Sequence, residues 1–389
     1  MGKQSKKSFL KNNKVKKTNI HNNNSNPRKK KFFSEVNNEI NANDNTNNTI
    51  NNDNDNNDKV IKDIGEEVGK YIGERNENNE KHGKGKLILD GVTLSGQWKN
   101  DEIVGEGKYK TKELTLKGSF SSGALNGIVK EFDRETKKLI FEGYYKEGVR
   151  SGKGTLYMDD GGSLRGNWGN GSLNGHGIYK FGDQRFTIEG QWENGLIVKG
   201  KYRLQFNEND NENDKPLAEY YKELPKKVKE FPIRYDISTD TTISSDPLMM
   251  DIYENYYSYV KESSIPNSGE GLFARVDIPV NTTLSFYNGV RIPHKTVNER
   301  SWDLNSNTIS LNSDVVIDVP SHLSSTSQYC ATISHKANHD LNKKNAEYSF
   351  YNHPRFGEIK SIKSIKPIKK DEEIFVSYDY TDEKPSWYK

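Results

Sequence analysis

Short alternations of apolar and polar residues run through the chain from residue 80 onwards and predict a mostly β protein. In the stretch 80–205 these runs are joined by polar turns, of which Asp90-Gly91 and Asp160-Gly161 are two-residue hairpin signals. In the stretch 255–389 the runs 315–319 and 374–378 are short, β-rich and bounded by Gly, Pro and Asn turns. The pattern therefore predicts two β-rich domains.

The apolar residues just before the first hairpins have a different spacing. Val60, Ile64, Val68 and Ile72 lie four residues apart, which predicts one short amphipathic helix over 60–79 that caps the first β domain. A polar run at 207–214 indicates a surface insertion, and we assign 206–254 to a linker region before the second domain.

The first β domain contains an internal repeat. A Gly-x-aromatic tripeptide recurs at spacings of 22, 25, 23 and 24 residues, and a glycine pair such as Gly105-Glu106-Gly107 follows most copies. One copy departs, with Gly127-Ile128-Val129 in place of the pair. A period of this length with hairpin turns predicts stacked units in which each ring packs where a glycine leaves room. The tripeptides begin at Gly96, Gly118, Gly143, Gly166 and Gly190.

Residues 1–59 have the composition of a disordered tail rich in Asn and Lys. The first 60 residues include 19 asparagines, and such a segment cannot bury enough apolar surface to offset its ordering entropy. The first 34 residues hold eleven Lys or Arg and no acid, with a cluster at Arg28-Lys29-Lys30-Lys31. This basic run indicates a nuclear import signal or a nucleic-acid tether, and the alternative is a solvated tail. The overall charge of +3 is too small to indicate a nucleic-acid-binding body.

The remaining composition excludes several kinds of site. The single Cys330 excludes an internal disulfide and a multi-cysteine zinc site, so we expect no metal. The chain has no apolar stretch long enough to span a bilayer and no secretory signal. We therefore expect an intracellular protein.

Five motifs of the second domain occur in the order in which they occur in SET-domain methyltransferases: Gly269-Glu270-Gly271-Leu272-Phe273, Ser285-Phe286-Tyr287-Asn288-Gly289, Asn338-His339, Tyr348 and Tyr378-Asp379-Tyr380. The repeats resemble MORN repeats. The two together are similar to the MORN-repeat lysine methyltransferases, which monomethylate lysine four of histone H3 and several non-histone proteins. The resemblance implies a hairpin stack over 80–205 and a knotted, β-rich SET domain over 255–389, in which S-adenosylmethionine and a peptide enter a narrow channel from opposite faces.

The resemblance also implies the role of individual residues. Glycines permit close backbone approach, and an Asn amide offers both a donor and an acceptor, which suits a zwitterionic cofactor. An aromatic channel favours the partly cationic methyl group and lowers the pKa of the incoming lysine by desolvation. The cofactor residues are Ser268, Gly269, Glu270, Asn338, His339 and Trp387. The catalytic residues are Tyr378, Tyr287, Tyr348 and Tyr380, and the substrate-binding residues are Asn307, Thr308, Ser310, Lys360 and Asn298.

Two sequence details bear on the product and the substrate. Tyr348 occupies the family's switch position and the other switch position is the small Val376, so we predict that one methyl group is added. Asn298 stands where vertebrate relatives have an acid that receives a basic peptide. We expect a substrate such as histone H3, a chromatin contact through the basic tail, a lipid or protein partner for the repeats, and a nuclear, chromosome-associated and in part cytoplasmic protein.

Two departures favour an alternative function. The loop from Asp340 to Asn345 has one extra residue, and the segment after the last tyrosines is short, running from Thr381 to Lys389. The alternative is a catalytically silent SET protein that acts as a MORN scaffold at a membrane or cytoskeletal site. A further alternative is a binding module tethered to chromatin by the basic tail.

Overall fold

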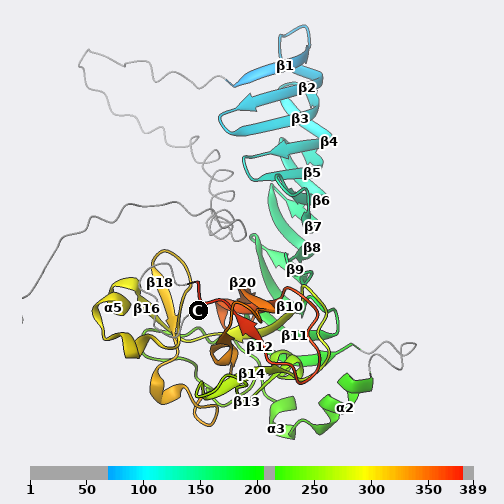
Figure 1. Ribbon diagram of the computed structural model, residues 1–389. Coiled ribbons are helices and arrows are strands. Elements are labelled where there is room, and N and C mark those ends of the chain that lie inside the picture. The colour runs from blue at the N-terminus through cyan, green and yellow to red at the C-terminus, as the bar shows by residue number, and fades with distance from the viewer. Residues whose placement is uncertain (1–68, 206–214, 380–389) are drawn as a thin grey trace, which may run out of the picture.

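The computed structural model describes residues 69–205 and 215–379. Figure 1 shows a long, twisted sheet of hairpins that stands on a second domain of short strands, and the C-terminal end of the described chain lies in that second domain. The prediction of a mostly β fold is confirmed. The predicted tail at 1–59 and the predicted surface insertion at 207–214 lie outside the described residues.

Twelve strands form the long sheet, and each strand is antiparallel to the next in sequence. Asp90 and Gly91 form a two-residue turn between β2 and β3, as predicted, with Gly91 at a φ of 71°. The strands are β1 Lys70–Arg75, β2 Lys81–Leu89, β3 Val92–Lys99, β4 Glu102–Lys110, β5 Leu114–Ser121, β6 Ala124–Asp133, β7 Leu139–Lys146, β8 Val149–Tyr157, β9 Ser163–Gly169, β10 Ser172–Lys180, β11 Phe186–Glu193 and β12 Leu196–Leu204.

A row of glycines crosses this sheet from strand to strand. Gly85, Gly96, Gly107 and Gly118 are direct cross-strand neighbours, and the row resumes on the other side of β6 with Gly143. The interruption is Val129, which lies in the copy whose sequence departs from the glycine pair. A Cβ atom at Gly107 would lie 2.9 Å from the Phe120 ring, and one at Gly177 would lie 2.9 Å from Trp192. The repeat therefore keeps glycine where a ring of the neighbouring unit needs the space.

The helix predicted over 60–79 is wrong where the structure describes it. Lys70–Arg75 forms the edge strand β1, which pairs with β2, and residues 60–68 lie outside the described part of the chain. Tyr71 packs its ring 5.5 Å from Trp98, while Ile72 is 52% exposed. The four-residue spacing did not produce a helix here. The open edge of β2 offers backbone hydrogen bonds, and Trp98 offers an aromatic contact, that a helix at this place would not make.

The second domain contains short helices and small sheets. Its helices are α2 Lys215–Glu223, α3 Lys226–Lys229, α4 Ile252–Tyr257 and α5 His294–Glu299, with 3₁₀ turns η1 Trp302–Asn305, η2 Ser321–Leu323 and η3 Ser334–Lys336. Its strands are β13 Ser258–Glu262, β14 Glu270–Ala274, β15 Thr283–Tyr287, β16 Val290–Pro293, β17 Thr308–Ser310, β18 Val315–Asp318, β19 Asn338–His339, β20 Ala346–His353, β21 Gly357–Ser364 and β22 Phe375–Val376. The sheets have the orders β13-β14, β15-β21-β20, β16-β18-β17 and β19-β22.

An aromatic cluster joins the two domains into one core. Phe181, in the turn between β10 and β11, is fully buried and stacks on Tyr253 of α4 with the ring centroids 4.4 Å apart. Its ring also lies near Phe286 of β15, at 6.5 Å. A buried hydrogen bond of 2.9 Å joins the hydroxyls of Tyr179 and Tyr351 across the same junction. The hairpins next to the second domain are thus part of its core as well as of the stack.

Candidate functional site

The site lies where three segments that are distant in sequence meet. β19 pairs in parallel with β22, so that Asn338 is opposite Phe375 and His339 is opposite Val376. On its other side the same C-terminal segment pairs with β14, because the amide of Ile374 donates to the carbonyl of Leu272 at 2.7 Å. The C-terminal segment is therefore held between β14 and β19. It brings Gly269-Glu270 next to Asn338-His339.

A polar network fixes the residues that were predicted to bind the cofactor. The Asn338 side-chain amide donates to the backbone carbonyl of Glu270 at 3.1 Å and to Glu373 at 3.3 Å, which leaves its carbonyl oxygen as an acceptor. The ammonium of Lys336 lies 2.7 Å from the Glu270 carboxylate. Ser268 and Gly269 are exposed on the adjoining loop, where Gly269 has a φ of 71° and open space beside it.

Glu373 holds that loop in place. It is 4% exposed and accepts hydrogen bonds from the Ser263 hydroxyl at 2.7 Å and the Ser264 amide at 2.8 Å, besides the Asn338 contact. The sequence analysis missed both Glu373 and Lys336. In the sequence, Glu373 is only the third acid of a run before the last tyrosines, and Lys336 lies two residues before Asn338. No motif or spacing distinguishes either residue from its neighbours.

Three predicted tyrosines lie around one point. Tyr287 ends β15 and Tyr348 lies in β20, and their rings meet edge to face with centroids 6.2 Å apart. Burial raises the pKa of Tyr287 well above its usual range, and the nearby Tyr348 and Tyr378 raise it further. The phenol of Tyr287 therefore stays neutral, as a hydrogen-bonding group in an aromatic wall.

Tyr378 is fixed at both ends. Its hydroxyl donates to the Ala337 carbonyl at 2.9 Å, and its backbone amide donates to Nδ1 of His339 at 3.1 Å. The rings of His339 and Tyr378 are 5.3 Å apart. The hydroxyl is thus tied to the segment that leads to Asn338. Tyr380 and Trp387, which were predicted with these residues, lie outside the described part of the chain.

Lys360 lies on the same sheet face as the tyrosines. It is directly opposite Tyr287 on one side and Phe350 on the other, and its ammonium is 3.4 Å from the centre of the Phe350 ring. Burial lowers the pKa of Lys360 to about 8. This lysine can therefore lose its proton more readily than an exposed one.

The structure places the other predicted substrate residues on a neighbouring sheet and helix. Thr308 and Ser310 belong to β17, with Asn307 just before it, and Asn298 is exposed on α5. The Thr308 hydroxyl donates to the Asn305 carbonyl at 2.9 Å, and the Ser310 hydroxyl to the Asn312 carbonyl at 3.2 Å. These contacts shape the β17 edge, and they do not link it to the tyrosines.

Behind the tyrosine wall lies a buried carboxyl group that the sequence analysis also missed. Glu254 of α4 is 1% exposed, and its Oε1 accepts hydrogen bonds from the Ser285 hydroxyl, the Phe286 amide at 2.7 Å and the Ile333 amide at 3.1 Å. It thus joins the strand that ends at Tyr287 to the segment that leads to Asn338. Burial raises the pKa of Glu254 to about 8, although these hydrogen bonds lower it.

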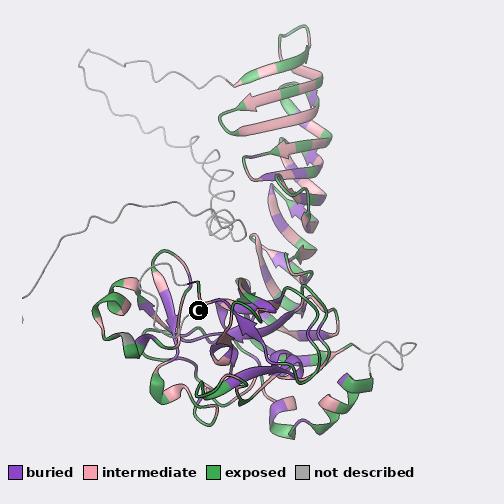
Figure 2. Ribbon diagram, in the orientation of Figure 1, coloured by how far each residue is buried: buried purple, intermediate pink, exposed green. Residues whose placement is uncertain are grey.

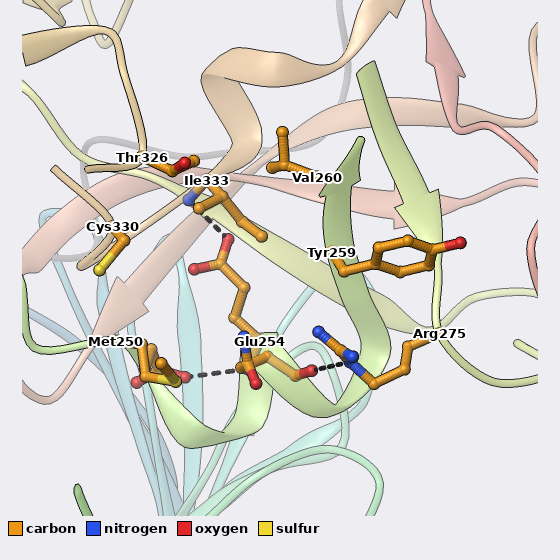
Figure 3. Close-up of a pocket in the computed structure, with 10 residues that line it drawn as sticks. Met250, Glu254, Tyr259, Val260, Arg275, Thr326, Cys330 and Ile333 are labelled. Carbon is orange, nitrogen blue, oxygen red and sulfur yellow. Dashed lines mark hydrogen bonds between the residues drawn. The ribbon is translucent and has the colours of Figure 1, made fainter. Parts of the chain in front are cut away.

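Figure 3 shows a cavity of about 280 Å³ beside Glu254, with Met250, Arg275, Cys330 and Ile333 in its lining. None of the predicted site residues lines this cavity. The candidate site is therefore identified by the Asn338 network and the tyrosines. The cavity lies among residues such as Glu254 and Ile333, which hold the segments of the site in place. Among the described residues, no three His, Cys, Asp or Glu side chains gather closely enough to hold a metal ion.

Comparisons with known proteins match both halves of the chain. A SET domain model matches residues 269–379, and a MORN repeat model matches residues 77–90, 95–112, 141–163, 165–184 and 189–204. Histone-lysine N-methyltransferase SETD7 of Halocynthia roretzi is 38% identical over 270 residues, which is 67% of this chain and 68% of that protein. The unmatched stretch 113–140 contains the copy with Val129, yet β5 and β6 continue the sheet there.

Two solved structures are also similar over part of the chain. A humanized mutant of the Chaetomium thermophilum Polycomb Repressive Complex 2 bound to the inhibitor GSK343 is 23% identical over 31% of this chain and 15% of that chain, with a TM-score of 0.25. The Chaetomium thermophilum complex in an autoinhibited conformation bound to S-adenosylmethionine is 22% identical over 32% of this chain and 15% of that chain, with a TM-score of 0.26.

Proposed function

Because this chain belongs to the MORN-repeat SET-domain protein-lysine methyltransferases, we propose that it transfers a single methyl group from S-adenosylmethionine to a lysine of histone H3 or of a non-histone protein. The observation that supports this best is the arrangement of Tyr287, Tyr348 and Tyr378 beside the Asn338 network. Aromatic rings and fixed oxygen atoms suit the transfer of a cationic methyl group to a neutral amine.

The residues present fit the cofactor. Gly269 leaves open space at the loop, and Asn338 keeps one acceptor oxygen after its two donated hydrogen bonds. The Lys336–Glu270 pair adds one charge of each sign, which is what a zwitterionic amino-acid group needs. Ser268, Gly269, Glu270, Asn338 and His339 would hold that group, and Trp387 would close over it. The bound cofactor supplies a methyl group on a sulfonium.

The tyrosines orient and desolvate the lysine. A free lysine has a pKa of about 10.4, and the aromatic wall lowers it so that the amine arrives with its lone pair available. When bound, the cofactor would supply its methyl group to this lone pair, and the tyrosines would hold the amine in place for the transfer. The Tyr378 oxygen and the Ala337 carbonyl lie together at 2.9 Å and favour the partial positive charge of the methyl group during transfer.

The hydroxyl of Tyr348 limits the product to monomethyl-lysine in this proposal. It fills the space into which a methylated amine would have to rotate, and Val376 at the other switch position is too small to do so. The substrate segment would lie along β17 and Lys360, and Asn298 presents an amide to it where an acid would attract a basic residue. We therefore expect a weaker preference for a basic residue at that position.

We also propose a nuclear, chromosome-associated location, with part of the protein in the cytoplasm. The support is the cluster Arg28-Lys29-Lys30-Lys31 in a tail without acids over its first 34 residues. Deletion of residues 1–34 from a fluorescently tagged chain should move it out of the nucleus, and unchanged nuclear retention would contradict this part of the proposal. Among the described residues, no helix is long and apolar enough to cross a membrane.

The test of catalysis is Tyr378→Phe, assayed with labelled cofactor on histones and on whole-cell lysate. Removing one hydroxyl aimed at the reacting group should lower methyl transfer by about 10²-fold. The melting temperature should stay the same, because the ring remains. Tyr259→Phe is the matched control, since its hydroxyl bonds Asp371 at 2.7 Å outside the site. Equal turnover in both variants would exclude the assigned role of Tyr378, and a wild-type chain that neither binds cofactor nor labels protein would favour the silent scaffold.

The test of product number is Tyr348→Phe, followed by mass spectrometry of a methylated peptide at long reaction times. The wild-type chain should stop at one methyl group, and the variant should gain dimethyl-lysine. Di- or trimethyl-lysine from the wild-type chain would mean that Tyr348 does not restrict the channel.

A further inference from the structure

The outer face of the long sheet carries a row of lysines that crosses successive strands. Figure 1 shows these strands stacked from the far end of the sheet towards the second domain. We call the set Lys86, Ser95, Lys108, Lys117 and Lys130 the lysine row; each member is directly opposite the next, across β2, β3, β4, β5 and β6. All four lysines are exposed.

The neighbouring residues confirm that the row lies on one face. Leu87, Leu94, Tyr109 and Leu116, each next to a row member in sequence, are packed against the core on the opposite face. Lys84 and Lys110 lie two positions from row members and add positive charge to the same outer face. Glu106, two positions from Lys108, adds one negative charge and accepts a hydrogen bond from the Ser119 hydroxyl at 2.7 Å. The face therefore has a positive stripe along the long axis of the sheet.

The charges of the row are poorly compensated. Lys108 is directly opposite Lys117, which is directly opposite Lys130, and like charges in this arrangement destabilise a sheet. Among the described residues, Lys86, Lys108 and Lys117 have no carboxylate within ion-pair distance, whereas Lys130 pairs with Glu142 at 3.0 Å where the row ends. Lys117 has only a ring contact, with its ammonium 4.6 Å from the centre of Phe132.

From these observations we propose that the lysine row binds the phosphate backbone of duplex DNA. Strands lie about 4.8 Å apart, so the row from Lys86 to Lys130 spans about 19 Å, a length over which a duplex presents roughly eleven phosphates. The affinity comes from counterion release and does not depend on base sequence. The site is separate from the tyrosines and needs no catalytic activity.

The twist of the sheet favours a duplex over a membrane. Adjacent strands rotate by roughly 20 to 25°, so the row turns by about 80 to 100° over its four strand-to-strand steps. A flat bilayer could contact only part of such a row, whereas the phosphates of a duplex also wind around an axis. The row itself contains lysines and a serine, and the exposed apolar side chains Ile128 and Tyr144 lie on this face only beside its end at Lys130.

The test uses the full chain and fluorescence anisotropy of a short, labelled DNA duplex of random sequence. The row variant combines Lys86→Gln, Lys108→Gln and Lys117→Gln. The matched control combines Lys227→Gln, Lys366→Gln and Lys370→Gln, which are exposed lysines of the second domain and give the same net charge. The basic tail is present in both chains, so its contribution cancels in the comparison.

The row variant should bind the duplex at least tenfold more weakly than the control. Its plot of log affinity against log salt should be shallower by about 2.7, since each lost phosphate contact removes about 0.9. Its melting temperature should not fall, because the substitutions remove repulsion between neighbouring lysines. Equal duplex affinity in the two variants would overturn the proposal. Vesicles of phosphatidylserine and phosphatidylcholine provide the second arm, and a loss confined to vesicle binding would overturn it in favour of a membrane surface.

Discussion

The long sheet and the catalytic domain differ in how far apart in sequence their paired strands lie. In the sheet every strand pairs with its neighbours in sequence, and the same glycine and ring recur at most steps. In the catalytic domain the pairs join distant segments, such as β15 with β21 and β19 with β22. A repeat unit is therefore stabilised mainly by the units beside it, while the active site depends on single groups that connect remote parts of the chain.

Burial along the sheet shows where the hairpins stop depending only on their neighbours and begin to pack against the catalytic domain. Figure 2 shows few buried residues in the hairpins far from the catalytic domain and many in those next to it. Trp98 and Ile103 are the buried hydrophobic residues of the described strands β1 to β4, whereas Leu173, Phe186 and Ile188 near the junction are fully buried. The last repeats therefore serve both as the end of the stack and as part of the catalytic core.

The largest expected effect comes from Phe181→Ala at the junction. Removing this fully buried ring, which stacks at 4.4 Å on Tyr253, should lower the free energy of unfolding by about 3 to 5 kcal/mol. Methyl transfer should be lost at a lower temperature than in the wild-type chain, because Tyr253 and Phe286 lose their common neighbour. Thermal inactivation followed by methyl transfer is the measurement.

Trp98→Ala is the comparison variant at the far end of the sheet. It also removes a buried ring, but that ring packs against Tyr71 of the first hairpin, at the end of the described sheet away from the catalytic domain. The outer hairpins should lose protection from hydrogen exchange while methyl transfer at 25 °C stays unchanged. A loss of activity as large as that of Phe181→Ala would show that the sheet does not behave as a series of local units.

A smaller effect is expected from Asn338→Ala, which removes one polar group that joins β14 to β19. The variant also removes the acceptor oxygen that Asn338 would offer the cofactor, so a polar group of the bound cofactor would be left unpaired at a cost of about 1 to 3 kcal/mol, or roughly 5- to 150-fold in affinity for S-adenosylmethionine. Calorimetric titration of the cofactor is the measurement. Asn342→Ala, on the exposed loop after β19, is the control, and equal affinities would contradict the assigned role of Asn338.

More of the long sheet than of the catalytic domain could be predicted from the sequence, and the reason is physical. The glycine and ring of each repeat are close in sequence, so their spacing already predicted the sheet and the place where Val129 interrupts it. The tyrosines and Asn338 were found through family motifs, but Glu254, Glu373 and Lys336 were not. Their roles depend on contacts 31 to 110 residues away along the chain, such as Glu254 with Ser285 and Glu373 with Ser263, and no local pattern encodes these contacts. The prediction of a capping helix was wrong for a related reason: residues 70–75 form a strand because they pair with the edge of β2.

The effect that is smallest per pH unit, and most specific to the catalytic domain, concerns Glu254. Burial raises its pKa to about 8 in the folded protein, against a usual value near 4.5, so the folded state holds a proton that the unfolded chain releases between these two values. Stability should therefore fall as pH rises through this window, by about 1 kcal/mol per pH unit between pH 6 and 7, and the decline should end above pH 8. Glu254→Gln keeps an oxygen for the Phe286 and Ile333 amides but cannot titrate, so the stability of this variant should depend less on pH.

Urea denaturation at a series of pH values measures how the stability of both chains changes with pH, with Glu230→Gln on the exposed end of α3 as the control. If the wild-type and Glu254→Gln chains lose stability equally over this range, then Glu254 is ionised in the folded state, and the three hydrogen bonds to its Oε1 outweigh the effect of burial.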